Sequence, residues 1–271
     1  MRLVIQGSFD PITQKELEWI RKEQKKQGIR DVWLYVKEQG VLEKHLRQTL
    51  VQRAAAPYRH MHVTLHTDEK DCICQIPADL AEEEAMVRSG IIRLAARGIR
   101  NMLWKETAVL EASVHARCTA HRASHSLSVA KTAAYFARRF GLDEERMRIA
   151  GYVHDITKKQ SDEENRRVME VWYPQYLSES PKVWHSFTAE VFLRQEMCCY
   201  DSVIRNAVKH HTLGDGRSDH DRILYIADKI EPTRPYSIEE EWKIAERSLK
   251  EAAAFIYEET RQFIDTEETN V

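Results

Sequence analysis

Residues 150–159 read AGYVHDITKK and place His154 and Asp155 side by side at the end of an apolar run. Neighbouring residues on a helix point about 100° apart, so both side chains cannot face a core in the ordinary way. Imidazole and carboxylate groups are both ligands for zinc, iron and manganese, which gives one reason for the pair. The alternative is a surface pair at a helix end, and partners elsewhere in the chain decide between the two.

The composition is that of a globular protein. The chain has 271 residues, of which 42% are apolar and 31% charged, enough for two domains or one large one. Its net charge of −2 gives no overall attraction to nucleic acid. No apolar stretch reaches the roughly 18 residues that a membrane span needs, and the five cysteines form no disulfide framework. We therefore expect a cytoplasmic protein with no nucleic-acid or membrane partner.

The two halves of the chain differ in their pattern. The first half predicts strands that alternate with helices, with strands at 2–7, 31–36 and 61–66 and helices at 14–27 and 42–55. Such alternation predicts a parallel, Rossmann-like sheet. From about residue 120 the strand signals stop. The predicted fold class is therefore multidomain, with a small α/β domain at 1–112 followed by an all-α domain at 113–271.

Turn and cap residues divide the second half into helices. Gly141 follows an apolar helical stripe over 125–140 and predicts a C-cap there. Ser237 and Glu240 have the spacing of a capping box, which predicts that a single long last helix begins at this point.

Several polar side chains of this half lie at helical spacing from apolar residues, which places them on buried helix faces. These residues are His125, His154, His185, His211 and Asp228. A single such histidine is most often a satisfied core residue, but an aspartate is rarely buried unless it is paired or bound to a metal. Five helices that each bury one such group, with Asp155 as a sixth, predict a metal centre.

The ligand order H…HD…H…H…D resembles that of the HD-domain metal-dependent phosphohydrolases. Within that superfamily, four segments resemble the YqeK family: HSLSVA at 125–130, AGYVHDITK at 150–158, HHTLG at 210–214 and YIADKIEPTRPY at 225–236. The resemblance covers about residues 115–260. It implies an all-helical HD domain with a di-iron centre that hydrolyses diadenosine tetraphosphate symmetrically.

Four histidines and two aspartates are too many for one tetrahedral ion but suit two ions that share a carboxylate. In this interpretation Asp155 bridges the ions and is catalytic. The resemblance distributes the other metal ligands between two ions, with His125, His154 and Asp228 at one and His185 and His211 at the other.

Substrate contacts are predicted next to these ligands. Lys158 lies one helical turn after Asp155 and could hold a phosphate oxygen in the reaction, or else be a solvent-exposed lysine beside Lys159. His210 and His211 cannot both point inward, and the apolar stripe selects His211 as the ligand. The resemblance adds further substrate contacts at His210, Thr212, Arg234 and Tyr236.

A second motif, GSFDPIT at 7–13, resembles the start of the nucleotidyltransferase motif of nicotinate-mononucleotide adenylyltransferases. In that family two histidines stabilise the triphosphate. Here Thr13 and Glu16 occupy the histidine positions and Lys15 replaces a glycine. Because a carboxylate repels polyphosphate, we expect an inactive domain that serves packing, dimerisation or nucleotide docking.

The sequence therefore predicts an enzyme, a hydrolase of dinucleoside polyphosphates with two transition-metal ions. Iron is the expected metal, with manganese or another divalent ion as the alternative, and a nucleotide is the expected partner. A homodimer is compatible with the sequence. Three other functions stay open: nicotinate-mononucleotide adenylyl transfer, HD nucleotidase or phosphodiesterase activity, and non-catalytic nucleotide sensing.

Overall fold

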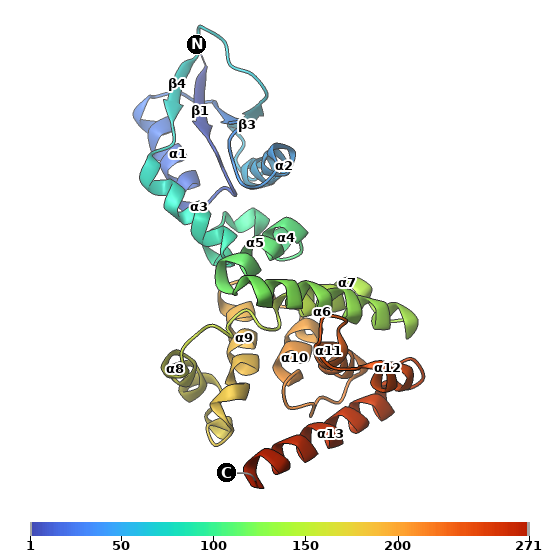
Figure 1. Ribbon diagram of the computed structural model, residues 1–271. Coiled ribbons are helices and arrows are strands. Elements are labelled where there is room, and N and C mark those ends of the chain that lie inside the picture. Colours follow the sequence, from blue (N-terminus) through green and yellow to red (C-terminus); the bar gives the residue numbers. More distant parts are fainter. Residues whose placement is uncertain (1, 270–271) are drawn as a thin grey trace. The chain divides into compact units, whose positions relative to one another are not determined.

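The structure is a computed structural model that describes the backbone of residues 2–269 and the side chains of residues 2–262 (Figure 1). The chain forms two compact units. The first runs to Ser113 and also includes Gln195–Cys198, and the second begins at Val114 and contains the remaining residues.

The N-terminal unit is built on a four-stranded, fully parallel sheet with the strand order β3-β2-β1-β4. The strands are β1 (Leu3–Gly7), β2 (Val32–Val36), β3 (Met61–Thr64) and β4 (Cys72–Gln75). The predicted parallel sheet is therefore confirmed. Two details differ from the prediction, because the third strand ends at Thr64 instead of residue 66 and β4 was not predicted.

Helices flank and extend this sheet. They are α1 (Gln14–Lys26), α2 (Lys44–Ala55), α3 (Ala81–Arg88), α4 (Arg100–Leu103) and the first part of α5 (Thr107–Arg117). In Figure 1, α1 and α2 lie on either side of the strands. The central strand β1 is fully buried at Leu3, Val4 and Ile5, as expected for a parallel strand covered on both faces.

The second unit is helical, as predicted. Its helices after α5 are α6 (Ala120–Arg139), α7 (Glu144–Val153), α8 (Asp162–Trp172), α9 (Trp184–Gln195), α10 (Ser202–His210), α11 (Asp219–Ile230), α12 (Glu239–Ala245) and α13 (Leu249–Thr269). Gly141 ends α6 with a positive φ of 69°, which confirms the predicted C-cap. Within residues 2–269, the helices are all too short or too polar to cross a membrane.

The prediction of a single long last helix is wrong. The chain forms two helices here, α12 and α13, and Ile238 precedes α12 without a side-chain cap. The backbone N–H of Glu251 instead donates to the hydroxyl of Ser248, 3.2 Å away. The signature of a serine followed three residues later by a glutamate occurs at both places, and the structure uses the second one to begin α13.

Helices α6 and α7, which follow each other in the chain, pack against each other at a glycine. A Cβ on Gly151 of α7 would lie 2.4 Å from Cα and 2.6 Å from N of Ala130 in α6. Backbone therefore meets backbone at this crossing. The contact fixes the distance between the helices that carry His125 and the His154–Asp155 pair.

Candidate metal centre

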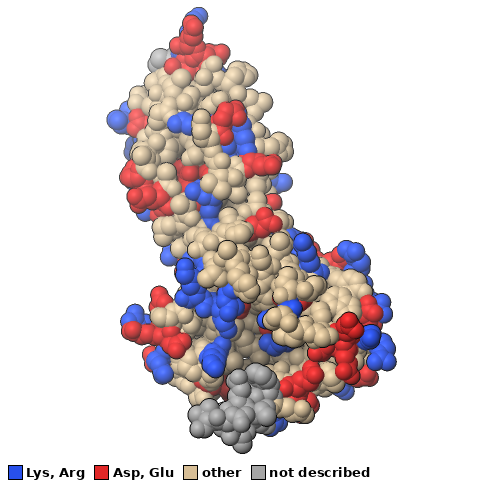
Figure 2. Space-filling view, viewed as in Figure 1, with Lys and Arg blue, Asp and Glu red and all other residues tan. Residues whose placement is uncertain are grey.

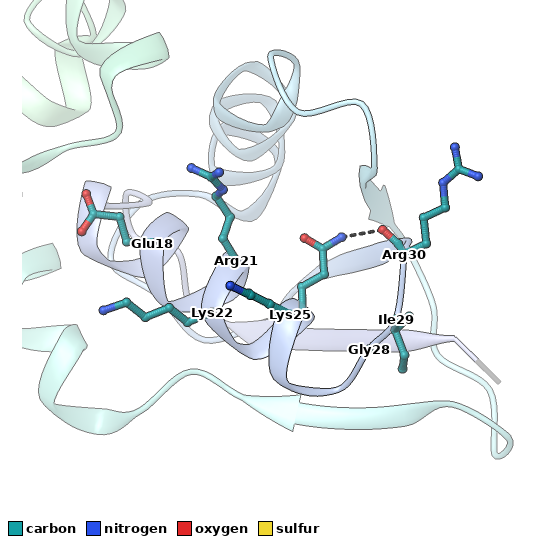
Figure 3. Close-up of a pocket in the computed structure, with 8 residues that line it drawn as sticks. Glu18, Arg21, Lys22, Lys25, Gly28, Ile29 and Arg30 are labelled. Atoms are coloured by element: carbon teal, nitrogen blue, oxygen red, sulfur yellow. Dashed lines mark hydrogen bonds between the residues drawn. The ribbon is translucent and has the colours of Figure 1, made fainter.

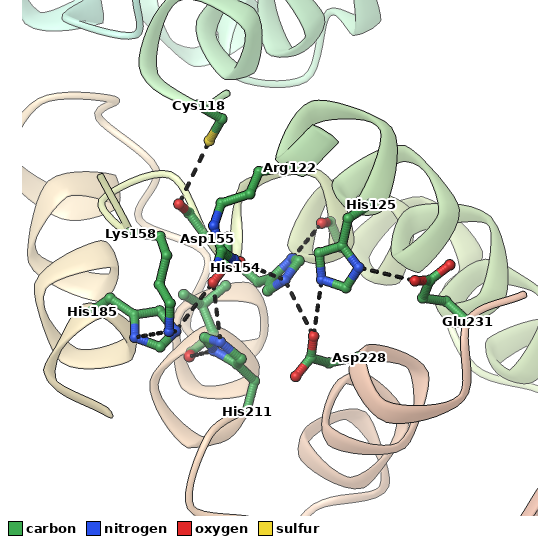
Figure 4. A network of polar contacts seen from close by, with 12 residues as sticks. Cys118, Arg122, His125, His154, Asp155, Lys158, His185, His211, Asp228 and Glu231 are labelled. Carbon is green, nitrogen blue, oxygen red and sulfur yellow. Dashed lines mark hydrogen bonds and ion pairs between the residues drawn. The ribbon is translucent and has the colours of Figure 1, made fainter. Parts of the chain in front are cut away.

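The six predicted ligands converge in the interior of the helical unit, where each is at most 7% exposed (Figure 4). Most of them come from helix ends. His154 is the C-cap of α7, His211 is the C-cap of α10, and Asp228 lies in the last turn of α11. Since the C-terminal end of a helix carries partial negative charge, three such ends favour a cation between them. His125 from α6 and His185 from the first turn of α9 complete the set.

The donor atoms form two trios, each with ligand atoms within 4.8 Å of one another. One consists of His125, His154 and Asp228, and the other of His154, Asp155 and His211. His185 joins the second trio, because its Nε2 lies 3.1 Å from Oδ1 of Asp155. The structure thus brings all six predicted ligands into one connected cluster.

The nitrogen Nε2 of His154 shows that the cluster is incomplete by itself. This atom is buried and has no hydrogen-bond partner among the described residues. It lies 3.6 Å from Oδ1 of Asp228 and 3.7 Å from Oδ2 of Asp155, beyond hydrogen-bond distance. A buried polar atom without a partner is costly, and an ion between these donors would satisfy it. The donor set of imidazole and carboxylate fits zinc, iron or manganese.

At four of the six ligands, electrostatics favour the protonation state that binds metal, whereas at His154 the neighbouring carboxylates of Asp155 and Asp228 outweigh burial and raise the pKa. Burial lowers the pKa of His211 to about 4 and also lowers the pKa of His185, so both rings are neutral near pH 7. Burial opposes ionisation of Asp155 and Asp228, but surrounding histidines and Lys229 outweigh it and hold the pKa of both carboxyls well below the usual range. Neutral imidazoles and ionised carboxylates are the ligand forms that coordinate metals.

Cationic side chains surround the two carboxylates. Arg122 donates from Nη1 to Oδ2 of Asp155 at 2.5 Å, and Lys229 lies with Nζ 2.9 Å from Oδ2 of Asp228. Arg234 contacts Oδ1 of Asp228 at 2.9 Å. In the space-filling view, Lys and Arg side chains gather on the face of the helical unit where α9 lies (Figure 2). Such a rim suits an anionic ligand.

The predicted substrate contacts differ in their positions. Lys158 lies at the cluster, with Nζ 3.0 Å from Nδ1 of His185, while Tyr236 donates to the carbonyl of Lys229. His210 pairs instead with Asp215, 2.6 Å away. The hydroxyl of Thr212 lies 2.9 Å from that of Ser186. The structure therefore brings Lys158 and Arg234 to the ligands but gives His210 and Thr212 partners outside the ligand set.

Sequence reasoning missed Glu231, which is 1% exposed and lies 3.1 Å from Nδ1 of His125. Burial opposes its ionisation, but hydrogen bonds from Ser128, Thr233 and His125 prevail and lower its pKa. The sequence did contain a signal for Glu231. It follows Asp228 by three residues, which places the two carboxylates on the same face at the end of α11. Arg122 had only its place before His125 as a signal.

The polar side chains in and beside the GSFDPIT motif are hydrogen-bonded within the N-terminal unit. Thr13 and Glu16 form a capping box at the start of α1, in which Glu16 accepts from the Thr13 N–H at 2.7 Å. Ser8 donates to Glu84 at 2.8 Å. Burial and the neighbouring Glu84 raise the pKa of Glu16 well above its usual range. Thr13 and Glu16, at the positions where the family has histidines, therefore cap the N-terminus of α1.

The same unit has an open groove elsewhere, along α1 and the turn that follows it (Figure 3). Its cationic lining consists of Arg21, Lys22, Lys25 and Arg30, with Glu18 at one end. The carbonyl of Arg30 accepts from Nε2 of Gln24 at 2.5 Å, which closes the turn. The groove is a solvated surface of one helix and does not include the GSFDPIT residues.

Comparison with known proteins gives the helical unit a family. A family model described as HD domain matches residues 122–233. The symmetrical bis(5'-nucleosyl)-tetraphosphatase of Bacillus subtilis is 31% identical over 157 residues, which cover 56% of this chain and 84% of that protein. A solved HD superfamily hydrolase involved in NAD metabolism, from Clostridium acetobutylicum, is similar with a TM-score of 0.55 and 27% identity over 59% of this chain and 87% of its own.

A further relative combines two names. The probable nicotinate-nucleotide adenylyltransferase/Ap4A hydrolase of Mycoplasma genitalium is 33% identical over 144 residues, covering 48% of this chain. The match spans only 40% of that relative, so this chain matches less than half of a protein with a two-part name.

Proposed function

The chain belongs to the HD-domain family of symmetrical bis(5'-nucleosyl)-tetraphosphatases, and from this we propose that it hydrolyses dinucleoside polyphosphates, with diadenosine tetraphosphate cut into two ADP. The observation that carries the proposal is the buried cluster of four histidines and two aspartates, with one nitrogen left without a partner. In this reaction water adds to an inner phosphorus, and the oxygen between the two central phosphates leaves with the second ADP.

The six side chains would hold two transition-metal ions, iron or manganese, with Asp155 shared between them. When bound, such ions activate water and neutralise the charge on the phosphates. The ionised state of Asp155 and Asp228 and the neutral state of His185 and His211 support this assignment.

The surrounding cations would bind the polyphosphate. Lys158 lies beside His185, and Arg234 lies beside Asp228, so cations flank the cluster at two places. A long polyphosphate that spans both would place a central phosphorus over the ligands, which favours symmetrical cleavage. Tyr236, two residues after Arg234, is 51% exposed, so its ring would meet a nucleoside while its hydroxyl donates to the Lys229 carbonyl. His210 and Thr212 would contact the substrate only after leaving their present partners.

We assign no adenylyl transfer to the N-terminal domain. The positions of that family's triphosphate-binding histidines form a capping box here, so neither Thr13 nor Glu16 supplies a cation for the phosphates. Incubation with nicotinate mononucleotide and ATP should release no pyrophosphate above background. Formation of the dinucleotide would instead support the adenylyltransferase alternative.

Product chromatography tests the main proposal. The protein is incubated with diadenosine tetraphosphate and added iron or manganese, and ADP is expected as the only nucleotide product. His154→Ala should lose bound metal and activity together, whereas Lys158→Ala should keep metal and turn over more slowly, since Lys158 would hold phosphate. Equal amounts of AMP and ATP would refute symmetrical cleavage. Activity on mononucleotides alone would make the protein a nucleotidase.

A further inference from the structure

The four histidines of the cluster share one orientation, in which Nδ1 is hydrogen-bonded away from the centre. In three of them the partner is the backbone carbonyl three residues earlier. His154 bonds to Gly151 at 2.8 Å, His211 to Val208 at 2.6 Å and His185 to Lys182 at 3.0 Å. A carbonyl only accepts, so Nδ1 must be the protonated nitrogen in His154 and His211. At His185 the carbonyl shares Nδ1 with the Lys158 ammonium, whose Nζ is also 3.0 Å away. Nε2 is thereby left free to face the centre.

Helix position explains why these carbonyls are available. His154 and His211 are C-caps, and the last carbonyls of a helix have no partner within it. His185 follows a short 3-10 turn at Pro181–Val183, where Lys182 lies just before α9 begins. The fixed orientation therefore comes from backbone geometry that no side-chain substitution removes.

His125 lies inside a helix and has no such acceptor. It is the sixth residue of α6, so the carbonyl three residues earlier, that of Arg122, lies within the helix and serves its backbone ladder. Its Nδ1 instead meets Oε1 of Glu231 at 3.1 Å, while its Nε2 lies 3.0 Å from Asp228. Glu231 takes the place that backbone carbonyls take for the other three rings.

Glu231 is itself held in position. It directly follows α11 and is 1% exposed. The N–H of Thr233 donates to Oε2 at 2.7 Å, and the Thr233 hydroxyl lies 2.7 Å from both carboxylate oxygens. A buried carboxylate held by several donors turns a histidine ring and fixes its tautomer.

We propose that Glu231 is the positioning residue for His125, which holds its Nδ1–H so that Nε2 faces the metal ligands. The inference rests on the proposed metal site for its effect on affinity, but the proton at Nδ1 of His125 is a property of the metal-free protein. There Asp228, 3.0 Å from Nε2, is the competing acceptor that Glu231 balances. Among the four cluster histidines, only His125 should change orientation when the Glu231 carboxylate is removed.

The test combines two measurements on Glu231→Met, which keeps the volume and removes the acceptor. Two-bond proton–nitrogen NMR spectra of the metal-free protein report the tautomer of each histidine, with His125→Gln used to assign the signals. We expect His125 to lose its Nδ1-protonated form while His154 and His211 keep theirs. Competition with a chelator should show metal binding about 10–100-fold weaker than in wild type.

Glu190→Met is the matched control, because Glu190 is also a buried carboxylate of this unit but pairs with Tyr173 and Arg205. It should lose stability and keep the wild-type spectrum and metal affinity. If Glu231→Met does not fold, Glu231→Gln takes its place. It should weaken metal binding, but by less than the roughly 10–100-fold expected for full loss of the acceptor, because one acceptor oxygen remains. An unchanged His125 tautomer would overturn the inference. Wild-type protein that binds no metal would instead refute the proposed function, with the tautomer result still standing by itself.

Discussion

Replacing Gly151 with alanine should destabilise the protein and weaken its metal site, although alanine is the better helix former. On helix propensity alone, the substitution would stabilise α7 by about 0.5–1 kcal/mol. The packing acts in the opposite direction. The new Cβ would lie 2.4 Å from Cα of Ala130, where ordinary contacts begin at 3.4 Å, so α6 and α7 must move apart by about 1 Å.

The separation has two costs. Overpacking of this kind costs about 1–3 kcal/mol, which exceeds the gain in propensity. The movement also changes the distance between His125 on α6 and His154, which follows α7 and whose Nδ1 is bonded to the Gly151 carbonyl. Metal-ligand distances tolerate only about 0.2 Å, so we expect metal affinity to fall about tenfold or more.

Denaturant unfolding of metal-free protein and chelator competition measure the two effects separately. Gly141→Ala is the matched control, since its φ of 69° strains an alanine while nothing lies within 4 Å of the new Cβ. It should lose stability and keep wild-type metal affinity. Adding Ala130→Gly to Gly151→Ala should not restore either property, because the clash is with backbone atoms. A Gly151→Ala protein more stable than wild type would refute the reasoning.

Two further predictions concern protons and metal. The folded-state pKa of Glu16 is raised above the ordinary 4.5, so its contribution to stability is complete below pH 4.5 and is lost as the pH rises through the folded-state pKa. Glu16→Gln should therefore match wild type near pH 4 and exceed it by about 1–3 kcal/mol at pH 8 in urea unfolding, and an equal difference at both pH values would contradict this. Removing metal with a chelator should lower the melting temperature of wild type but leave that of Asp155→Ala unchanged, and an equal drop in both would show that the lost ions bind elsewhere.

Much of the fold followed from periodicity, and its misses have local causes. The alternation of buried strands and amphipathic helices predicted the parallel sheet correctly. Strand β4 escaped because Cys72–Gln75 is only four residues long and half exposed, which leaves little pattern to detect. The break between α12 and α13 escaped because no glycine or proline marks it, and two serine–glutamate pairs offered the same capping signal. Tertiary contacts decide between such equal signals, and a sequence does not contain them explicitly.

The metal ligands could be predicted from sequence periodicity, but the side chains that hydrogen-bond to those ligands could not. Five of the six ligands lie at helical spacing from apolar residues, so a period of three or four residues reveals them, and Asp155 was predicted from its place beside His154. The partners of those ligands follow no period. Arg122 and Glu231 meet Asp155 and His125 through contacts 33 and 106 residues apart in sequence. For three of the histidines the supporting acceptor is a backbone carbonyl. Every residue has one, so the residue type does not show which carbonyl is used. His125 differs because it lies inside α6, where the carbonyl three residues earlier serves the helix backbone. Its Nδ1 therefore needs an acceptor from another part of the chain, and Glu231 supplies it.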